Sequence, residues 1–96
     1  MHPDDADDLE LDDDNIVHLA GHSISPRDVL QVWSNEPVYV PNKKGLSATY
    51  LMLGDTYGGR ALTIAVLPNA TTRLLRPITG WNSTNGELTR WRPGRR

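Results

Sequence analysis

The chain has 96 residues and no cysteine, so it allows one domain and excludes disulfide frameworks and cysteine-based zinc sites. No apolar run approaches the roughly 20 residues that a membrane span needs, and the acidic N-terminus is the opposite of a secretory signal peptide. These features predict a cytoplasmic protein with a small core, which a partner or a homodimer would help to stabilise.

Charge is distributed unevenly along the chain. Residues 1–14 contain eight acidic side chains, whereas residues 15–96 contain four acidic and all ten basic side chains, a formal charge of +6 against −8. A basic body permits a phosphate-bearing partner, although many small domains carry such an excess without one. Dense like charge with little apolar content predicts that residues 1–14 are a disordered acidic tail. That tail either solubilises the protein or mimics phosphate over the basic face of its own domain.

Two helices are predicted in the next part of the chain. The first covers residues 15–20, where Asn15 is a suitable N-cap. The second has Ser25 as its N-cap and Asp28 at the N3 position, where a carboxylate favours the helix dipole. An apolar stripe follows at helical spacing, and the helix ends before Pro37.

Four strands and a closing helix are predicted after these helices. Each strand is bounded by residues typical of turns, and the four cover residues 38–40, 48–53, 60–67 and 72–79. Consecutive strands joined by tight turns form antiparallel hairpins. Ser83 or Thr84 caps a last helix through Trp91, and residues 93–96 fray. The sequence therefore predicts one α+β domain over residues 15–92, with two helices, a four-stranded antiparallel sheet and a C-terminal helix.

Few of the motifs that carry chemistry are present. His18 and His22 are four residues apart and would share a helix face as zinc ligands do, but no third ligand accompanies them, so we expect no metal and no cofactor. The chain has no P-loop, dinucleotide-binding fingerprint or nucleophile elbow. His22 remains a candidate general base or phosphate contact because imidazole titrates near neutrality.

Cations and aromatic rings are the remaining candidates for binding. Five cations lie in the region of the expected sheet: Lys43, Lys44, Arg60, Arg73 and Arg76. Trp81 follows a glycine at the exit of the last strand, where an exposed ring can stack on a base. Trp33 and Trp91 are expected to pack between helices and sheet.

Several short motifs follow one another in a recognisable order. Residues 22–29 form a helix start that contains a histidine, residues 50–54 and 59–64 read aromatic-apolar-Gly and then Gly-Arg with an apolar strand, and residues 76–81 read Arg-Pro-Ile-Thr-Gly-Trp. The pattern closes with Ser83, Thr84, Glu87 and Trp91. Together these motifs resemble the BrnT-type ribonuclease toxins and related short domains of unassigned function, over about residues 18–92.

The resemblance implies a fold similar to that of RelE-type toxins and a toxin-like ribonuclease of a type II toxin–antitoxin system, bound by a cognate antitoxin protein. Attack of a ribose 2′-hydroxyl on the adjacent phosphate needs a proton acceptor and cations that stabilise the phosphate oxygens, without a metal. The expected catalytic residues are Arg76, Glu87, His22 and Lys43. The expected RNA-binding residues are Lys44, Arg60, Arg73 and Trp81.

Three positions depart from the family pattern. Trp81 stands where the family has an arginine, Thr49 where it has a basic or polar residue, and Ser23 where it has a glycine. Loss of an arginine removes a planar donor suited to phosphate, and loss of a comparable transition-state donor costs about 10²–10³ in rate. The alternative interpretation is therefore a non-catalytic RNA- or protein-binding module on the same scaffold.

Overall fold

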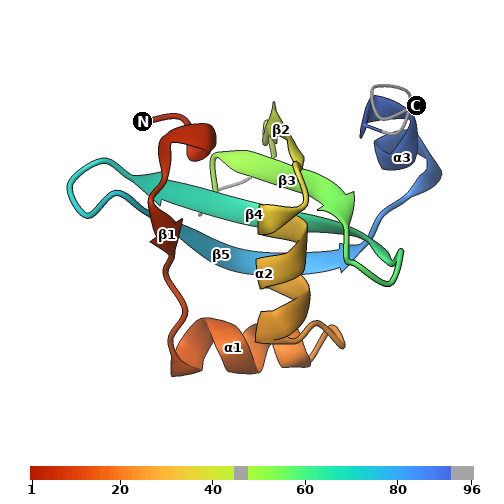
Figure 1. The fold of residues 1–96 in the computed structure, drawn as a ribbon, viewed down its shortest axis with the longest axis horizontal. Helices are drawn as coiled ribbons and strands as arrows, with labels where there is room; N and C mark the ends of the chain where they lie inside the picture. Colours follow the sequence, from red (N-terminus) through yellow and green to blue (C-terminus); the bar gives the residue numbers. More distant parts are fainter. Residues whose placement is uncertain (45–47, 92–96) are drawn as a thin grey trace.

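The computed structural model describes residues 1–44 and 48–91, and within them the chain forms an α+β domain with a five-stranded mixed sheet (Figure 1). The elements are η1 (Pro3–Asp5), β1 (Asp8–Leu9), α1 (Asp13–Ala20), α2 (Pro26–Ser34), β2 (Val38–Pro41), β3 (Tyr50–Asp55), β4 (Ala61–Asn69), β5 (Leu74–Asn82) and α3 (Asn85–Trp91). The strand order is β1-β5-β4-β3-β2, with β1 parallel to β5 and the other pairs antiparallel.

The expectation of a four-stranded antiparallel sheet is wrong by one strand. β1 adds a fifth, parallel strand at the free edge of β5, where Leu9 pairs with Leu75. Backbone hydrogen bonds of 2.8 Å from Asp7 N to the Arg73 carbonyl and from Glu10 N to the Leu75 carbonyl complete this pairing. An unpaired edge strand offers a row of backbone groups, and β1 satisfies part of that row.

Residues 1–14, expected to be disordered, instead contribute η1, β1 and the beginning of α1. Two arginines on or next to β5 offset the like charge of this segment. Arg73 lies 3.0 Å from Asp7, and Arg76 lies 2.6 Å from Asp12. Ala6 and Leu9 also pack against the core, so the segment buries some apolar surface despite its composition.

The helix caps agree in part with the sequence prediction. Ser25 and Asp28 form the expected cap of α2, in which each side chain accepts a hydrogen bond from the backbone of the other. For α1 the N-cap is Asp12, and Asn15 takes the N3 position of the same motif. The helix therefore begins before the position that the sequence indicated, because Asp12 and Asn15 are both good capping residues.

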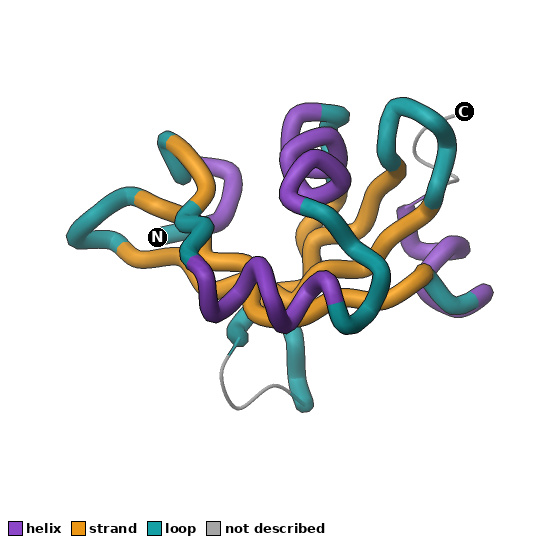
Figure 2. The backbone as a smooth tube through the Cα atoms, turned by 90° about the horizontal axis from the view of Figure 1, so that it is seen from below, coloured by secondary structure: helices purple, strands orange, loops and turns teal. Residues whose placement is uncertain are grey.

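The two faces of the sheet bury different sets of side chains. Figure 2 shows α2 on one side of the sheet and α1 running along its edge. The main core fills the α2 side and consists of Leu19, Ile24, Val29, Val32, Met52, Leu62, Ile64, Val66 and Leu75. On the opposite face, which we call the back face, Trp91 of α3 packs against Val40 and Leu53. Trp91 is thus in a core as expected, and Trp33, although only half-buried, packs against the main core.

None of the helices in the described ranges is both long enough and apolar enough to cross a bilayer.

Candidate nucleic-acid interface

The strand register brings Thr63 and Trp81 to the centre of the back face. Leu53 pairs with Thr63, and Thr63 pairs with Trp81, so the three side chains point to the same side of the sheet. Trp81 was expected after the last strand, but it lies within β5 and is half-buried. Its ring therefore lies on the back face, where only part of its surface is accessible to a ligand.

The carboxylate of Glu87, on α3, accepts hydrogen bonds from both Thr63 and Trp81. Thr63 Oγ1 donates to Glu87 Oε1 at 2.8 Å, and Trp81 Nε1 donates to the same oxygen at 3.0 Å. The backbone N–H of Thr84 donates to Oε1 at 2.8 Å, and Thr84 Oγ1 accepts from the Glu87 N–H at 3.2 Å. Thr84 and Glu87 thus form the reciprocal cap that starts α3 and fixes the helix to β4 and β5.

The environment of Glu87 favours its ionised form. Burial raises the pKa of this carboxyl group. Hydrogen bonds from Thr84, Thr63 and Trp81 lower it by a larger amount, so the pKa of Glu87 is below that of an ordinary glutamate. A carboxylate that already accepts several hydrogen bonds is a weak proton acceptor. The expected role of Glu87 as a general base is therefore poorly supported by its geometry.

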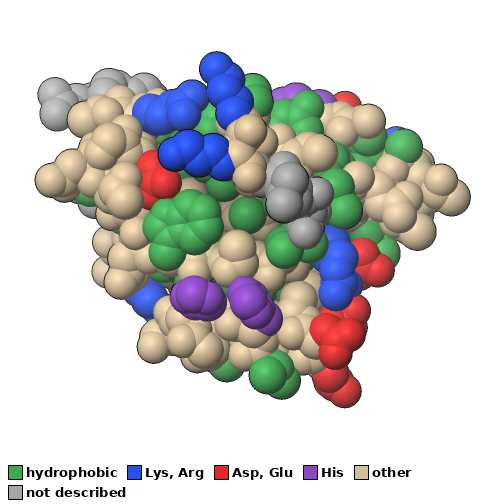
Figure 3. All heavy atoms as spheres, turned by 180° about the vertical axis from the view of Figure 1, so that it is seen from behind, with side chains coloured by type: hydrophobic (Ala, Val, Ile, Leu, Met, Phe, Trp, Pro, Cys, Tyr) green, Lys and Arg blue, Asp and Glu red, His purple; other side chains and the backbone are tan. Residues whose placement is uncertain are grey.

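A cationic cavity of about 350 Å³ lies beside Glu87. Among the described residues, its charged lining is Lys43, Lys44, Arg90 and the carboxylate of Glu87, and its remaining lining is Pro41, Asn42 and Leu51. The three cations are all exposed. Figure 3 shows Lys and Arg side chains gathered at one end of this face, around an acidic side chain and next to a large hydrophobic one. Three cations around one carboxylate that is already hydrogen-bonded leave an excess of positive charge for an anion.

Arg76 lies in a different place from this cationic cavity. Its guanidinium donates to both oxygens of Asp12, at 2.6 and 3.2 Å, and Glu10 lies 3.9 Å away. The hydrogen bonds to Asp12 raise the pKa of Arg76 and, together with the Asn15 backbone, hold the pKa of Asp12 below its usual value. Arg76 and Lys43, which were both expected to be catalytic, line two separate cavities.

The cavity beside Arg76 has a volume of about 130 Å³, smaller than the cationic cavity, and a histidine is part of its lining. His18 lines it together with Asp14, Asn15 and Arg76. The Nε2 atom of His18 lies 3.0 Å from Thr79 Oγ1, and its ring centroid lies 5.3 Å from that of His22. His22 itself lines neither this cavity nor the cationic one. Of the two histidines, His18 is therefore better placed to act on a ligand held by Arg76.

The remaining two arginines of the predicted site make contacts within the fold. Arg60 donates to the Ser23 carbonyl at 2.6 Å and to Asn82 Oδ1 at 3.0 Å, and it lies 3.4 Å from Asp28. Arg73 occupies a turn with φ of 60° and donates to Asp7 and to the Asp5 carbonyl. Neither lines the cationic cavity, and both link segments far apart in sequence.

The structure thus brings together Lys43, Lys44, Glu87 and, through a hydrogen bond, Trp81, but separates Arg60, Arg73 and Arg76 from them. Arg90 was missed by sequence reasoning, although it follows Glu87 by three residues and so shares its helix face. Within residues 1–44 and 48–91 no group of three metal-ligating side chains is found.

Comparison of the chain with family models, with curated proteins and with solved structures finds no match.

Proposed function

We propose that this protein binds single-stranded RNA on its back face, as a non-catalytic binding module on a scaffold similar to the RelE and BrnT toxins. The observation that carries the proposal is the cavity lined by Lys43, Lys44 and Arg90. Phosphate contacts from such cations supply most of the sequence-independent affinity for nucleic acid.

The position of Trp81 agrees with this proposal. The hydrogen bond from its indole N–H to Glu87, which lines the cavity, fixes the ring close to the cations. Stacking of a base on an aromatic ring contributes about 1–3 kcal/mol. A phosphate in the cavity and a base against the ring would then be neighbours on one strand of RNA.

The salt dependence of binding tests the proposal. Affinity for a fluorescent single-stranded RNA is measured by anisotropy over a range of salt concentrations. Each phosphate contact in a single strand contributes about 0.7 to the slope of log K against log salt. We expect the slope to fall by about 0.7 in Arg90→Gln and by about 1.4 in the double variant Lys43→Gln/Lys44→Gln.

Arg27→Gln is the matched control, because Arg27 is also an exposed helical arginine but lies at the start of α2. The slope should be unchanged in this variant. Equal losses in Arg27→Gln and Arg90→Gln would mean that only net charge matters, and a slope near zero in the wild-type protein would remove the proposal.

Metal-independent RNA cleavage by a toxin-like enzyme is the second candidate, and the pairing of His18 with Arg76 in one cavity favours it. An imidazole there would accept the proton of the 2′-hydroxyl as its oxygen attacks phosphorus. The bond to the 5′-oxygen then breaks, and that oxygen takes up a proton. Arg76 would stabilise the phosphate only after Asp12 releases it, because both Asp12 oxygens now accept from the guanidinium.

Incubation of purified protein with single-stranded RNA and EDTA separates the two candidates. If the protein cleaves, Arg76→Ala should lower the rate about 10²–10³-fold, Asp12→Asn should raise it, and Arg73→Ala should leave it unchanged. RNA binding without a cleavage product selects the binding module. Growth arrest on expression alone, relieved by a co-expressed antitoxin, would support the toxin.

A further inference from the structure

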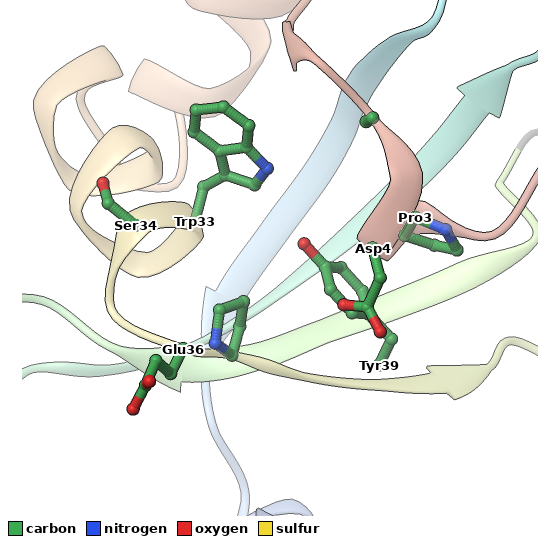
Figure 4. Close-up of a pocket in the computed structure, with 8 residues that line it drawn as sticks. Pro3, Asp4, Trp33, Ser34, Glu36 and Tyr39 are labelled. Carbon is green, nitrogen blue, oxygen red and sulfur yellow. The ribbon is translucent and has the colours of Figure 1, made fainter.

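A larger cavity of about 450 Å³ lies on the α2 side of the sheet, between η1, the end of α2 and the beginning of β2 (Figure 4). Two aromatic side chains, two carboxylates and two prolines dominate its lining: Trp33, Tyr39, Asp4, Glu36, Pro3 and Pro37. The volume is within the range of small-molecule sites. This cavity shares no lining residue with the two cavities near the back face.

The two rings offer π surfaces from different elements. Figure 4 shows Trp33 on the last turn of α2 and Tyr39 on β2 facing the same space. Both are half-buried against the main core. The Tyr39 hydroxyl donates to Met52 Sδ at 3.4 Å, and the His2 ring meets Tyr39 edge-on with centroids 5.9 Å apart. These contacts fix the orientation of the Tyr39 ring.

The charged side chains among the described lining residues of this cavity are both carboxylates, Asp4 and Glu36. Burial raises the pKa of the Tyr39 hydroxyl well above its usual value, and the negative charge of Asp4 raises it by a smaller amount. The phenol is therefore neutral, and Asp4 is close enough to act on it electrostatically. His2 lies beside this carboxylate: its Nδ1 atom lies 3.5 Å from Asp4 Oδ2 and 3.1 Å from the backbone nitrogen of Asp4.

We propose that this cavity binds an organic cation, an alkylammonium or guanidinium group seated between Trp33 and Tyr39 with Asp4 at its edge. Cations are attracted to the faces of Trp and Tyr rings, and aromatic cages with a nearby carboxylate are a recurrent way to bind them. The described lining contains no lysine or arginine that would repel such a ligand. The cation is either a free small molecule or a side chain of a peptide, and the site is independent of RNA binding.

Nuclear magnetic resonance titration of the full chain at constant ionic strength tests this site. The probes are tetramethylammonium chloride, the amidated peptide acetyl-Gly-Arg-Gly and its neutral counterpart acetyl-Gly-Gln-Gly. Saturable shifts of the Trp33 indole and of the amides of η1 and β2 are expected with one or both cations and not with the neutral peptide. Binding of the salt alone identifies a free cation as the ligand, and binding of the arginine peptide identifies a side chain.

Asp4→Asn and Asp5→Asn form a matched pair, because both residues lie in η1 and are exposed but only Asp4 lines the cavity. Asp4→Asn should weaken binding about threefold, the effect of one solvent-exposed ion pair, and Asp5→Asn should not. Trp33→Leu should weaken it about two- to fivefold through loss of the ring face, with thermal unfolding as the check on its fold. Equal weakening by Asp4→Asn and Asp5→Asn, or the absence of saturable shifts with either cation, would overturn the proposal.

Discussion

Glu87 joins three segments of the chain through one carboxylate. Its oxygens accept from Thr63 on β4, from Trp81 on β5 and from the backbone of Thr84 at the start of α3. The hydrogen bond from Thr84 was foreseeable, because a Ser or Thr three residues before a Glu is a local capping signal. The hydrogen bonds from Thr63 and Trp81 were not foreseeable, because no local sequence pattern predicts the strand register that brings these two residues to Glu87.

Replacement of Glu87 by glutamine should destabilise the protein most at neutral pH. Because the folded pKa of Glu87 is below the ordinary value of 4.5, its carboxylate stabilises the fold at pH values above 4.5. That contribution is lost as the pH falls through the lowered folded pKa. We expect Glu87→Gln to lower the free energy of unfolding by about 1 kcal/mol at pH 7, the usual difference between a hydrogen bond to a charged acceptor and one to a neutral acceptor.

Urea unfolding of the wild-type and Glu87→Gln proteins at pH values from 7 down to 3 measures this difference. The gap between the two unfolding free energies should close as the pH is lowered. Glu10→Gln is the control, because the Glu10 carboxylate lies 3.9 Å from Arg76 at the opposite edge of the sheet. A gap that is constant with pH would contradict the assignment of the lowered pKa to Glu87.

At the scale of elements, the helices and the antiparallel hairpins could be predicted, and β1 could not. Caps such as Ser25 with Asp28, and the alternation of apolar residues, are local features of the sequence. β1 has only two residues within a run of acids, and it exists because β5 offers an unpaired edge and nearby arginines. Its formation is a tertiary effect that overrides composition.

Truncation of residues 1–10 should therefore destabilise the domain, and not only expose the basic face that an acidic tail could cover. The truncated chain loses the backbone pairing of β1 with β5 and the packing of Ala6 and Leu9 on the core. Burial of a leucine side chain stabilises a fold by roughly 1.5–3 kcal/mol, so we expect a loss of about 2 kcal/mol. Urea unfolding measures the loss, and faster hydrogen exchange of β5 amides should accompany it.

The full-length double variant Asp5→Asn/Asp8→Asn is the control for this truncation, because it removes charge and keeps the strand. Its stability should equal or exceed that of the wild-type protein, since like charges in the segment are reduced. A truncated chain as stable as the full one would restore the interpretation of residues 1–14 as a tail outside the fold.

At the scale of the whole molecule, the charge asymmetry was visible in the sequence but its consequence was not. The acids of the N-terminal segment neutralise Arg73 and Arg76 at the β5 edge, whereas Lys43, Lys44 and Arg90 lie together at another end of the domain. Figure 3 shows a group of cations at the top of the back face, around one acidic side chain, and a group of acids at its lower right, next to another cation. The expected catalytic residues Arg76 and Lys43 therefore lie in different parts of the charge distribution, which depends on the fold and not on local sequence.

This charge distribution predicts an effect of the acidic edge on the rate of RNA association, given that the back face binds RNA. Carboxylates that do not touch the RNA still repel its phosphates over a Debye length of about 10 Å at 0.1 M salt. Replacement of Asp8 and Asp13, which are both exposed, by asparagine should raise the association rate about threefold at low salt, because electrostatic steering acts on encounter. Stopped-flow anisotropy measures this rate. The difference from the wild-type protein should vanish at about 1 M salt, where the Debye length is about 3 Å, and a difference that persists there would indicate a changed contact instead of a changed field.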